Sequence, residues 1–472
     1  MSEAIGEMIL PGTYIEVRAE GLIGVGGIST GNIGVVGTAN RGPIDEVKIL
    51  GSYSEALDTF GSYDRWPDDA GATRLTLTRT LEQIFKGGGS TVYAVRVANG
   101  NPKAMTWVVD DATDPLFTLT ATSPGTWAND ITATLKTPAG APVTIELVYK
   151  RAKETFSGAN AGDLVREING ASRLVKVTDL KEADKAKAPK TLTAATGGNI
   201  GGPDGATATA TEIEKGLNLL ASEPVNIIAI GGLDAKAITG SVLAHLEATE
   251  NDGRERLAVL GVSDNEPAKI ASDDVSKGSN PRLILVAPGI VADDAARVDD
   301  ANKSVKLTAP YAAALVAGRL STLAPHISLT NKDVAADDLT RQYTRAEQKN
   351  LLGNRVLVLQ KNLGIRVLKG ITTDTAAFRQ ISVRRIVDYA KTGVRIGSNP
   401  YIGRLNNSRV RSALKATLDG FLSSMVLDEM LVSYTLDVSA TRAQEIVGQA
   451  VVTMTLRPTF SIDFVKVIMN LE

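Results

Sequence analysis

Residues 211–262 read TEIEKGLNLLASEPVNIIAIGGLDAKAITGSVLAHLEATENDGRERLAVLGV and decide the fold class of this chain. Two runs within this stretch, VNIIAIGG and RLAVLGV, are apolar on both faces, and amphipathic helical segments alternate with them. Strands of this kind, alternating with helices, are typical of a parallel sheet that is covered on two sides. The stretch therefore predicts an α/β layer, with Thr211 as the cap of its first helix.

The same pattern continues on both sides of this stretch. It comprises predicted strands at 32–39, 91–100 and 282–289 and predicted helices at 52–61, 72–89 and 309–325. The glycines at 87–89 suit a left-handed helix end, and the helix at 309–325 is apolar on most faces, so we expect it to be buried. Residues 105–210 differ, because short alternating runs rich in Thr, Ala, Pro and Gly predict a small β-rich domain inserted into the α/β layer.

A separate α+β domain is expected from residue 341 onward. It contains predicted strands at 355–360 and 364–370, a helix near 378–393 and a long helix at about 407–431 with one apolar stripe. We therefore expect a multi-domain α/β protein with five parts. They are an N-terminal arm and glycine-rich tether (1–31), an α/β core (32–104 and 211–340), the inserted β-rich domain (105–210), a C-terminal domain (341–460) and a C-terminal strand arm (461–472).

Both ends of the chain are predicted to be strands. Residues 13–17 alternate between apolar and polar faces, and residues 460–464 do the same. The apolar face then moves to positions 465, 467 and 469, which a bulge at 464–465 would reconcile. An apolar strand at the end of a chain must pair within its own fold or be donated to a neighbouring copy, because its backbone groups otherwise lack partners.

Composition excludes several classes of protein. The absence of cysteine rules out disulfides and thiolate metal sites, and only two histidines, His245 and His326, are available for acid–base chemistry. We expect both histidines to have structural roles. No apolar run reaches the roughly 20 residues that span a bilayer, and the first residues lack the basic region of a signal peptide. We therefore expect assembly in the cytoplasm and no membrane insertion.

The charge is distributed unevenly along the chain. Residues 341–415 carry 16 Lys and Arg against 3 Asp and Glu, whereas residues 1–340 carry 32 against 43. Such a chain can pair with copies of itself or bind an acidic protein partner. Our candidates for this contact are Arg404, Arg409, Arg411 and Lys415. Nucleic acid is a weaker interpretation, because the aromatic residues of the basic region show no repeated spacing for stacking on bases. These aromatic residues are Tyr343, Phe378, Tyr389 and Tyr401.

The motifs of catalysis are not supported by their context. Residues 27–31 satisfy G-x-S-x-G, but a predicted strand follows the serine where a nucleophile elbow needs a helix. The sequence has no H-E-x-x-H motif and no phosphate-binding loop with its lysine. The aspartate pairs at 68–69, 293–294 and 299–300 fall on polar loops or helix starts, where solvated caps are expected more often than a metal site. We therefore predict no enzyme activity, no cofactor and no metal.

Five separate segments of the chain are distinctive, namely LPGTYIEV (10–17), IGVVGTANRGPIDE (33–46), SPGTWANDI (123–131), GIRVLKGITTDTAAFRQISVRRIVDY (364–389) and IVGQAVVTMTLRPTFSIDFVKVIM (446–469). These segments resemble the contractile tail sheath family, also called the subtilisin-like tail sheath family. Each segment is short, but their order and spacing match the family over nearly the whole chain. The chain departs from the family where Phe378 stands in place of a frequent tryptophan and Ala128 in place of a frequent glycine.

The resemblance implies a structural subunit that forms hexameric rings and a six-fold helical sleeve around an inner tube protein. Baseplate and tail-terminator proteins would lie at its ends, and the C-terminal domain would face the tube. Extended arms would join a sheet in neighbouring subunits and keep the sleeve connected during contraction. On the matching positions, the N-terminal arm is Tyr14, Ile15, Glu16 and Val17, and the C-terminal arm is Phe464, Val465, Val467 and Ile468. The subtilisin-like label concerns the fold, not proteolysis.

We therefore interpret the chain as the sheath subunit of a contractile particle. A phage tail, a tailocin and a toxin-delivering injection system are all compatible with the sequence, and each would leave the cell after assembly. Another self-assembling or interaction protein without contraction is the first alternative. An α/β hydrolase is a weaker one, because the expected motifs lack their context.

Overall fold

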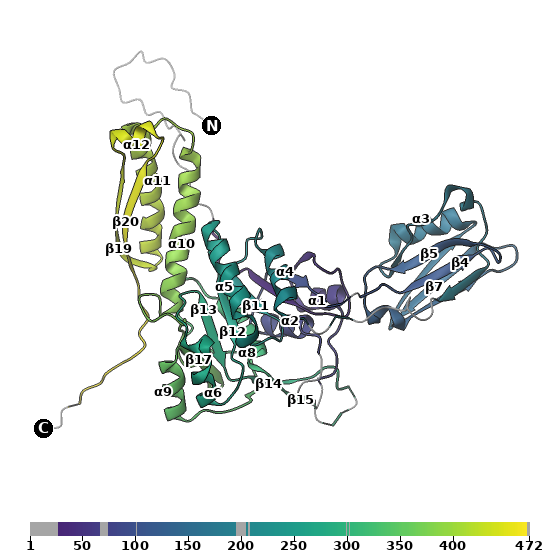
Figure 1. Cartoon of the computed structure of the whole chain (residues 1–472), viewed down its shortest axis with the longest axis horizontal. Coiled ribbons are helices and arrows are strands. Elements are labelled where there is room, and N and C mark those ends of the chain that lie inside the picture. Colours follow the sequence, from purple (N-terminus) through teal and green to yellow (C-terminus); the bar gives the residue numbers. More distant parts are fainter. Residues whose placement is uncertain are drawn as a thin grey trace, which may run out of the picture. The chain divides into compact units, whose positions relative to one another are not determined.

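The structure is a computed structural model that describes residues 27–66, 74–100, 102–194, 204–205, 208–298, 300–301 and 303–469 (Figure 1). The chain forms two compact units. The α/β unit comprises residues 31–322 and 330–374, and the C-terminal unit comprises residues 1–30, 323–329 and 375–472. Each unit is described by itself below.

An eight-stranded sheet forms the centre of the α/β unit. Its strands, in spatial order, are β18 (Ile365–Val367), β17 (Val356–Lys361), β13 (Leu283–Ala287), β12 (Leu257–Gly261), β11 (Ile227–Ile230), β1 (Ile33–Gly37), β3 (Val92–Arg96) and β2 (Val47–Leu50). The six inner strands run parallel, and the two edge strands, β18 and β2, pair antiparallel. Strands β1, β3, β11, β12 and β13 are buried at every residue, as their apolar runs predict.

Helices cover the faces of this sheet, and the α/β class predicted from the sequence is confirmed. They are α1 (Tyr53–Phe60), α2 (Leu77–Lys86), α4 (Ala210–Leu220), α5 (Ala235–Asn251), α6 (Pro267–Ser272), α7 (Asp274–Lys277), α8 (Ala309–Ser321) and α9 (Arg345–Gly353). Helix α8 is buried along almost its whole length, as expected. The predicted cap of α4 is wrong by two residues, because Thr209 begins the helix and forms a capping box with Glu212. A three-stranded sheet of β14 (Ile290–Asp293), β15 (Ser304–Leu307) and β16 (Asp338–Leu339) completes this part.

Strands β17 and β18 belong to the large sheet and not to the C-terminal unit. The prediction of a C-terminal domain that begins at residue 341 therefore differs from the structure, in which this unit takes up the chain again at residue 375. The reason is that β17 is buried like the other inner strands, whereas the boundary at 341 followed the basic charge of the segment. Residues 375–472 carry 12 Lys and Arg against 8 Asp and Glu, so the charge contrast between the units is smaller than the contrast between the sequence segments.

The inserted domain has its own apolar core and two antiparallel sheets. Its elements are β4 (Thr106–Asp110), β5 (Pro115–Ala121), β6 (Ile131–Lys136), β7 (Val143–Tyr149), β8 (Ala152–Gly158), α3 (Ala161–Ala171), β9 (Val175–Lys176) and β10 (Thr191–Ala194). Two of the family-like segments meet at its base. The backbone N–H of Gly42 donates to Ser123 Oγ at 3.0 Å, and the Arg41 guanidinium stacks over the Trp127 ring at 4.5 Å. The fully buried Arg96 donates to the carbonyls of Gly42 and Pro124.

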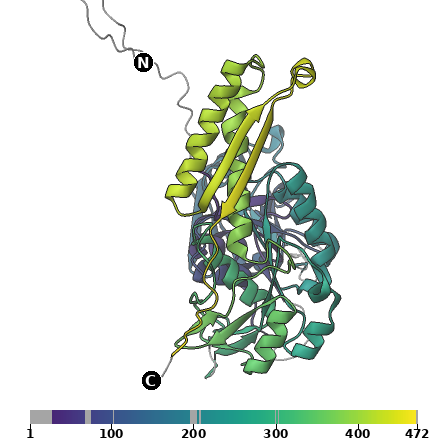
Figure 2. The same cartoon turned by 90° about the vertical axis from the view of Figure 1, so that its left-hand side faces the viewer.

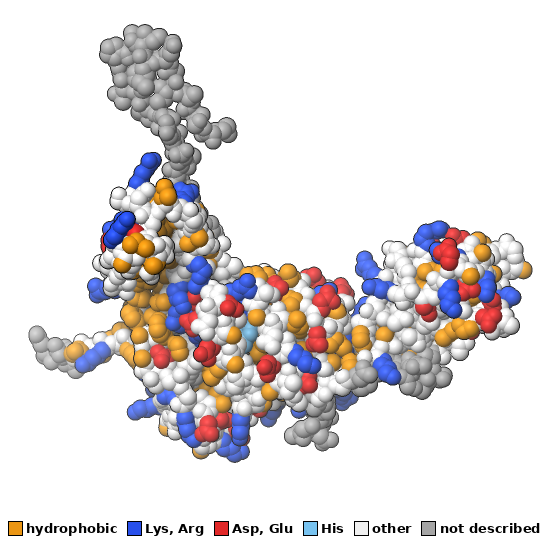
Figure 3. All heavy atoms as spheres, turned by 45° about the horizontal axis from the view of Figure 1, so that its top comes forward, with side chains coloured by type: hydrophobic (Ala, Val, Ile, Leu, Met, Phe, Trp, Pro, Cys, Tyr) orange, Lys and Arg blue, Asp and Glu red, His pale blue; other side chains and the backbone are white. Residues whose placement is uncertain are grey.

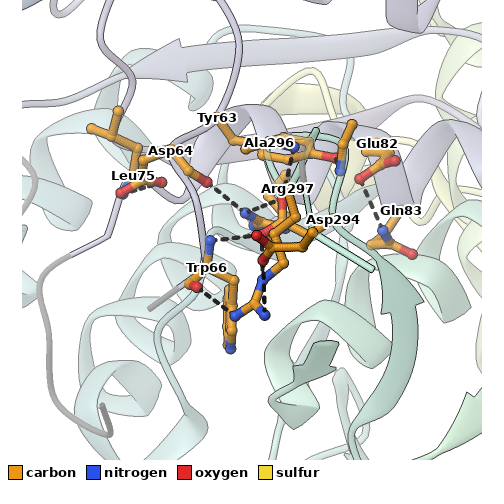
Figure 4. Close-up of polar contacts among 12 residues, drawn as sticks. Tyr63, Asp64, Trp66, Leu75, Glu82, Gln83, Asp294, Ala296 and Arg297 are labelled. Atoms are coloured by element: carbon orange, nitrogen blue, oxygen red, sulfur yellow. Dashed lines mark hydrogen bonds and ion pairs between the residues drawn. The ribbon is translucent and has the colours of Figure 1, made fainter. Parts of the chain in front are cut away.

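A buried ion cluster joins two distant loops of the α/β unit (Figure 4). The Asp294 carboxylate is fully buried and accepts hydrogen bonds from the backbone N–H groups of Trp66 at 2.7 Å and Ala296 at 3.0 Å. Its oxygens lie 3.5 Å from Arg79 Nη2 and 3.7 Å from Arg297 Nε. The prediction of a solvated cap at 293–294 is therefore wrong for Asp294, because tertiary packing encloses the loop that carries it.

His245 has a structural role, as expected. Its ring is buried in α5, and Arg256 Nη1 lies 2.9 Å from His245 Nε2. Because an arginine can only donate, this nitrogen must accept, which requires a neutral ring. Burial, together with the positive charge of Arg256, lowers the pKa of His245 to about 4. His326 lies in residues 323–329, which belong to the C-terminal unit.

The C-terminal unit consists of two long helices and a hairpin (Figure 2). The helices are α10 (Ile381–Ser398) and α11 (Ser408–Leu427), and the hairpin strands are β19 (Leu431–Ser439) and β20 (Val451–Pro458), with the short helix α12 (Arg442–Ile446) between them. The apolar stripe predicted for the long helix packs as expected, with Leu414, Leu418, Phe421 and Met425 buried. Strand β19 was not predicted. Its position directly after the helix and its alternation with polar residues gave only a weak signal.

Candidate assembly interface

One face of the β19–β20 hairpin packs on the helices of its own unit. The inward side chains contact the core formed by α10 and α11, and the outward side chains are polar. The inward set is Tyr434, Leu436, Val438, Val452 and Leu456, and the outward set is Thr435, Asp437, Thr453, Thr455 and Arg457. The Tyr434 hydroxyl, 2.7 Å from both Asp419 Oδ1 and Ser423 Oγ, ties the hairpin to α11. The hairpin is therefore held firmly on one face only.

Both edges of this hairpin are open in the described part of the chain. The sheet contains two strands, paired from Leu431 with Pro458 to Ser439 with Val451, and no described strand extends it on either side. A two-stranded sheet presents outward N–H and C=O groups on both edges, which makes it a template for added strands. The hairpin can thus accept one strand on each side by β-augmentation.

The segment after the hairpin exposes a row of apolar side chains. Between residues 460 and 469 seven such side chains are 62–84% exposed, namely Phe460, Ile462, Phe464, Val465, Val467, Ile468 and Met469. In Figure 3 this segment, just before the grey C-terminal residues, shows orange and blue atoms standing away from the body of its unit. The structure assigns no strand to residues 459–469, so the predicted C-terminal strand does not form within the single chain.

The start of this segment is held by α10. Gln380 Nε2 donates to the Ser461 carbonyl at 3.4 Å and to Asp463 Oδ2 at 3.1 Å, and the Ser461 N–H donates to Gln380 Oε1 at 3.3 Å. The hydrogen bonds with Gln380 therefore hold the backbone of Ser461 and the side chain of Asp463, while the apolar side chains around them stay exposed. No local pattern marks Gln380 for this role, because its partners lie 81 and 83 residues away along the chain.

The N-terminal segment enters the unit at a second point on the same helix. Arg385 is buried, and its Nη2 donates to the carbonyls of Leu323 at 2.8 Å and Thr30 at 3.2 Å. Ile28 packs against the apolar core of α10 and α11. The predicted N-terminal arm residues, Tyr14, Ile15, Glu16 and Val17, lie outside the described residues.

The four predicted basic contact residues lie just before α11 or in its first half, but they differ in whether other side chains already bind them. Arg411 Nη1 lies 3.0 Å from Glu445 Oε1, and Lys415 Nζ lies 3.5 Å from Asp437 Oδ1. Arg411 is therefore engaged within the unit, whereas the exposed Lys415 pair contributes little to stability. Arg409 is exposed, and Arg404 is exposed beside the Tyr401 ring.

Exposed apolar side chains, which the sequence does not predict to form a site, lie next to Arg404 and to Glu445, the partner of Arg411. Ile402 and Leu405, on the loop before α11, and Ile446 and Val447, where α12 ends and the loop to β20 begins, are 73–79% exposed. The two loops are tied by a hydrogen bond from Asn406 Nδ2 to the Gln449 carbonyl at 2.9 Å. They border a cavity of about 400 Å³, also lined by Val410, Leu414 and Val452. A fixed pair of loops that exposes aliphatic side chains is typical of a protein contact surface.

Comparison with known proteins identifies the family. Residues 206–373 match the phage tail sheath protein central domain, and residues 373–472 match the phage tail sheath C-terminal domain. The chain belongs to the phage tail sheath family. A tail sheath protein of Mycobacterium phage Bxz1 is 26% identical over 216 residues, which covers 42% of this chain and 36% of that protein. The family boundary at 373 agrees with the start of the C-terminal unit at 375 in the structure.

Solved structures of sheath proteins share the fold over almost the full length. The sheath tail protein of Desulfitobacterium hafniense is 19% identical, with a TM-score of 0.65 and coverage of 95% of this chain and 100% of that one. The sheath tail protein of Listeria innocua is 16% identical, with a TM-score of 0.67 and coverage of 92% and 93%. The contracted helical sheath of the anti-feeding prophage is 13% identical, with a TM-score of 0.55 and coverage of 98% and 99%.

The described residues give the G-x-S-x-G match the same context as the sequence does. Ser29 of the G-x-S-x-G match is exposed, and the next element along the chain is strand β1, not a helix. Within the described ranges, no three His, Asp or Glu side chains gather as a metal site. No described helix is both long enough and apolar enough to cross a membrane.

Proposed function

We propose that this sheath family chain is the structural subunit of a contractile sheath in a phage tail or a phage-tail-like particle. Its copies assemble as a six-fold helical sleeve around an inner tube, and contraction of the sleeve drives the tube through a target envelope. The chain assembles in the cytoplasm and leaves the cell as part of the particle. Baseplate and tail-terminator proteins bind the ends of the sleeve. The main partner is therefore a second copy of the same chain.

The observation that carries this proposal is the pairing of an exposed donor with an open acceptor on one unit. The donor is the apolar segment at 464–469, and the acceptor is the hairpin with two open edges. In the sleeve, the C-terminal arm residues Phe464, Val465, Val467 and Ile468 of one copy add a strand to the hairpin of a neighbour. The N-terminal arm residues Tyr14, Ile15, Glu16 and Val17 of another copy add a strand on the other edge.

Strand exchange of this kind suits a sleeve that must rearrange without falling apart. Each added strand forms backbone hydrogen bonds along an edge and buries side chains that are exposed in the single chain. Burying one such side chain fully is worth about 1.5–3 kcal/mol. The covalent connection within each arm keeps neighbours linked while the larger contacts between α/β units change.

Electron microscopy of the purified chain tests this function. We expect long striated cylinders with six-fold symmetry, because the chain carries both the donor and the acceptor of the contact. A self-assembling protein without contraction would form cylinders whose width, and whose length per subunit, stay the same under all conditions. A discrete particle or a monomer at every concentration would contradict the proposal.

The surface of the C-terminal unit around Ile402, Leu405, Arg404 and Arg409 is proposed to contact the inner tube. Arg404 and Arg409 would provide the charge, and Ile402 and Leu405 the apolar anchors. Arg411 pairs with Glu445 and helps to keep the surface in place, and Lys415 pairs weakly with Asp437. Removing two exposed aliphatic anchors from a contact costs at least about 2 kcal/mol in binding.

The corresponding prediction concerns the double variant Ile402→Ser, Leu405→Ser. When it is produced together with the tube protein, we expect cylinders to form but at least about tenfold fewer of them to contain a tube, because 1.4 kcal/mol corresponds to a factor of ten. Leu427→Ser, equally exposed at the end of α11, is the matched control and should leave tube filling unchanged. Normal tube filling in the double variant would show that this surface is not the contact.

A further inference from the structure

Both arms emerge from the C-terminal unit at contacts with the same helix. Gln380, at the start of α10, holds the beginning of the C-terminal segment, and Arg385 holds the end of the N-terminal segment. These two residues are five positions apart, which is less than one and a half helical turns. The exit points of the two arms are therefore fixed to one short stretch of one helix.

The Gln380 contact resembles a pairing between two strands. Its side-chain amide both donates to and accepts from the backbone of Ser461, at 3.4 and 3.3 Å, and also donates to Asp463 at 3.1 Å. Gln380 is the N-cap residue of α10 and has an extended backbone, with φ −82° and ψ 129°. An amide that satisfies both backbone groups of one residue fixes the direction as well as the position of the segment.

The Arg385 contact is deeply buried. Its guanidinium donates to three carbonyls, those of Thr30, Leu323 and Ala324, at 3.2, 2.8 and 3.2 Å. Burial lowers the pKa of Arg385 to about 10. A buried cation is costly unless its donors are satisfied, so these carbonyls must stay in place. The last residues of the N-terminal segment are thereby tied to α10, and the packing of Ile28 on the same core supports this position.

We propose that α10 is a common anchor for both arms, with Gln380 and Arg385 as its positioning residues. The inference rests on the proposed function, in which each arm is bound by a different neighbour. Tension applied through one arm then passes along one continuous helix to the other arm and does not have to cross the α/β unit. The fold of the α/β unit is therefore protected while the sleeve contracts.

The anchor can be tested in the single chain, before any assembly. The sequence contains no cysteine, so spin labels can be placed at chosen sites without background. One pair uses Ser29→Cys with Leu427→Cys, and the other uses Ile462→Cys with Leu427→Cys. All three positions are exposed. For each pair, double electron–electron resonance then measures the distribution of distances between the labelled arm residue and the label at position 427 of α11.

We expect narrow distributions for both pairs in the otherwise unchanged chain. Gln380→Ala should widen the distance distribution of the 462–427 label pair at least about twofold, because the C-terminal segment loses its hydrogen bonds with Gln380. The distribution of the 29–427 pair should stay unchanged. Arg385→Met should do the reverse, so each variant is the control for the other. Arg385→Lys keeps the charge and should give an intermediate width, which preserves the test if Arg385→Met does not fold. Broad distributions in the parent chain, or narrow ones in the variants, would overturn the proposal.

A second measurement concerns the assembled sheath. In electron micrographs, contracted sheaths of the double variant Gln380→Ala, Arg385→Lys should break into shorter pieces than those of the parent chain. Arg151→Met, at an exposed turn of the inserted domain, is the control and should leave sheath length unchanged. Absence of cylinders from the parent chain would count against the proposed function only, because the label measurements need no assembly. Contracted sheaths of equal length in the double variant would contradict the transfer of tension through α10.

Discussion

Removal of residues 464–472 should abolish sheath formation and leave a folded, dispersed chain. The deletion begins directly after Asp463, so the hydrogen bonds of Gln380 with Ser461 and Asp463 are retained. It removes the apolar side chains Phe464, Val465, Val467, Ile468 and Met469, all of them exposed in the single chain. Their removal should change the free energy of unfolding of the single chain only slightly, whereas each copy in a sheath loses the whole strand that it adds to a neighbour.

The measurement combines electron microscopy with thermal unfolding. We expect no cylinders at concentrations at which the parent chain forms them, together with an unchanged melting temperature. The double variant Val465→Ile, Val467→Ile keeps the length, shape and strand preference of the arm and should still assemble. Cylinders formed by the truncated chain would refute the role of the C-terminal arm. A melting temperature that fell sharply would show instead that the segment belongs to its own fold.

Substitution of Asp294 by Ala should destabilise the α/β unit by about 3–5 kcal/mol. The carboxylate is fully buried and compensates the buried guanidinium of Arg79 as well as that of the partly buried Arg297. Its loss also leaves the N–H groups of Trp66 and Ala296 without their acceptor. Removing one partner of a buried ion cluster is costly, because the remaining charges stay enclosed in a medium of low polarity.

Urea unfolding followed by tryptophan fluorescence measures this effect, since Trp66 lies at the cluster (Figure 4). Asp300→Ala is the matched control. Asp300 pairs with Arg65 at 2.8 Å and Arg297 at 3.6 Å but is partly exposed, so its loss should cost less than about 1 kcal/mol. Equal effects of the two substitutions would show that the buried position of Asp294 has no special weight.

For the predicted basic site, sequence patterns predict the charge of the residues but not their partners. The sequence predicts Arg404, Arg409, Arg411 and Lys415 as contacts from their charge alone, and in the structure they lie just before α11 or in its first half. Charge alone could not show that Arg411 and Lys415 are engaged by Glu445 and Asp437. Their partners lie more than twenty residues away and are brought close only by the packing of the hairpin on α11. The aliphatic side chains of the same surface gave no sequence signal, because isolated apolar residues in loops are common.

Local chemistry alone determined the α/β layer, the buried α8 and the unusual apolar ends of this chain. Alternation, helical periodicity and long apolar runs report which face of an element avoids water, and that depends on neighbouring residues only. Tertiary structure decided that β17 joins the large sheet, that Asp294 is buried, and that Gln380 and Arg385 hold the two chain ends. These outcomes depend on contacts between residues far apart in sequence, and a single side chain carries no mark of the distant backbone group that it will meet.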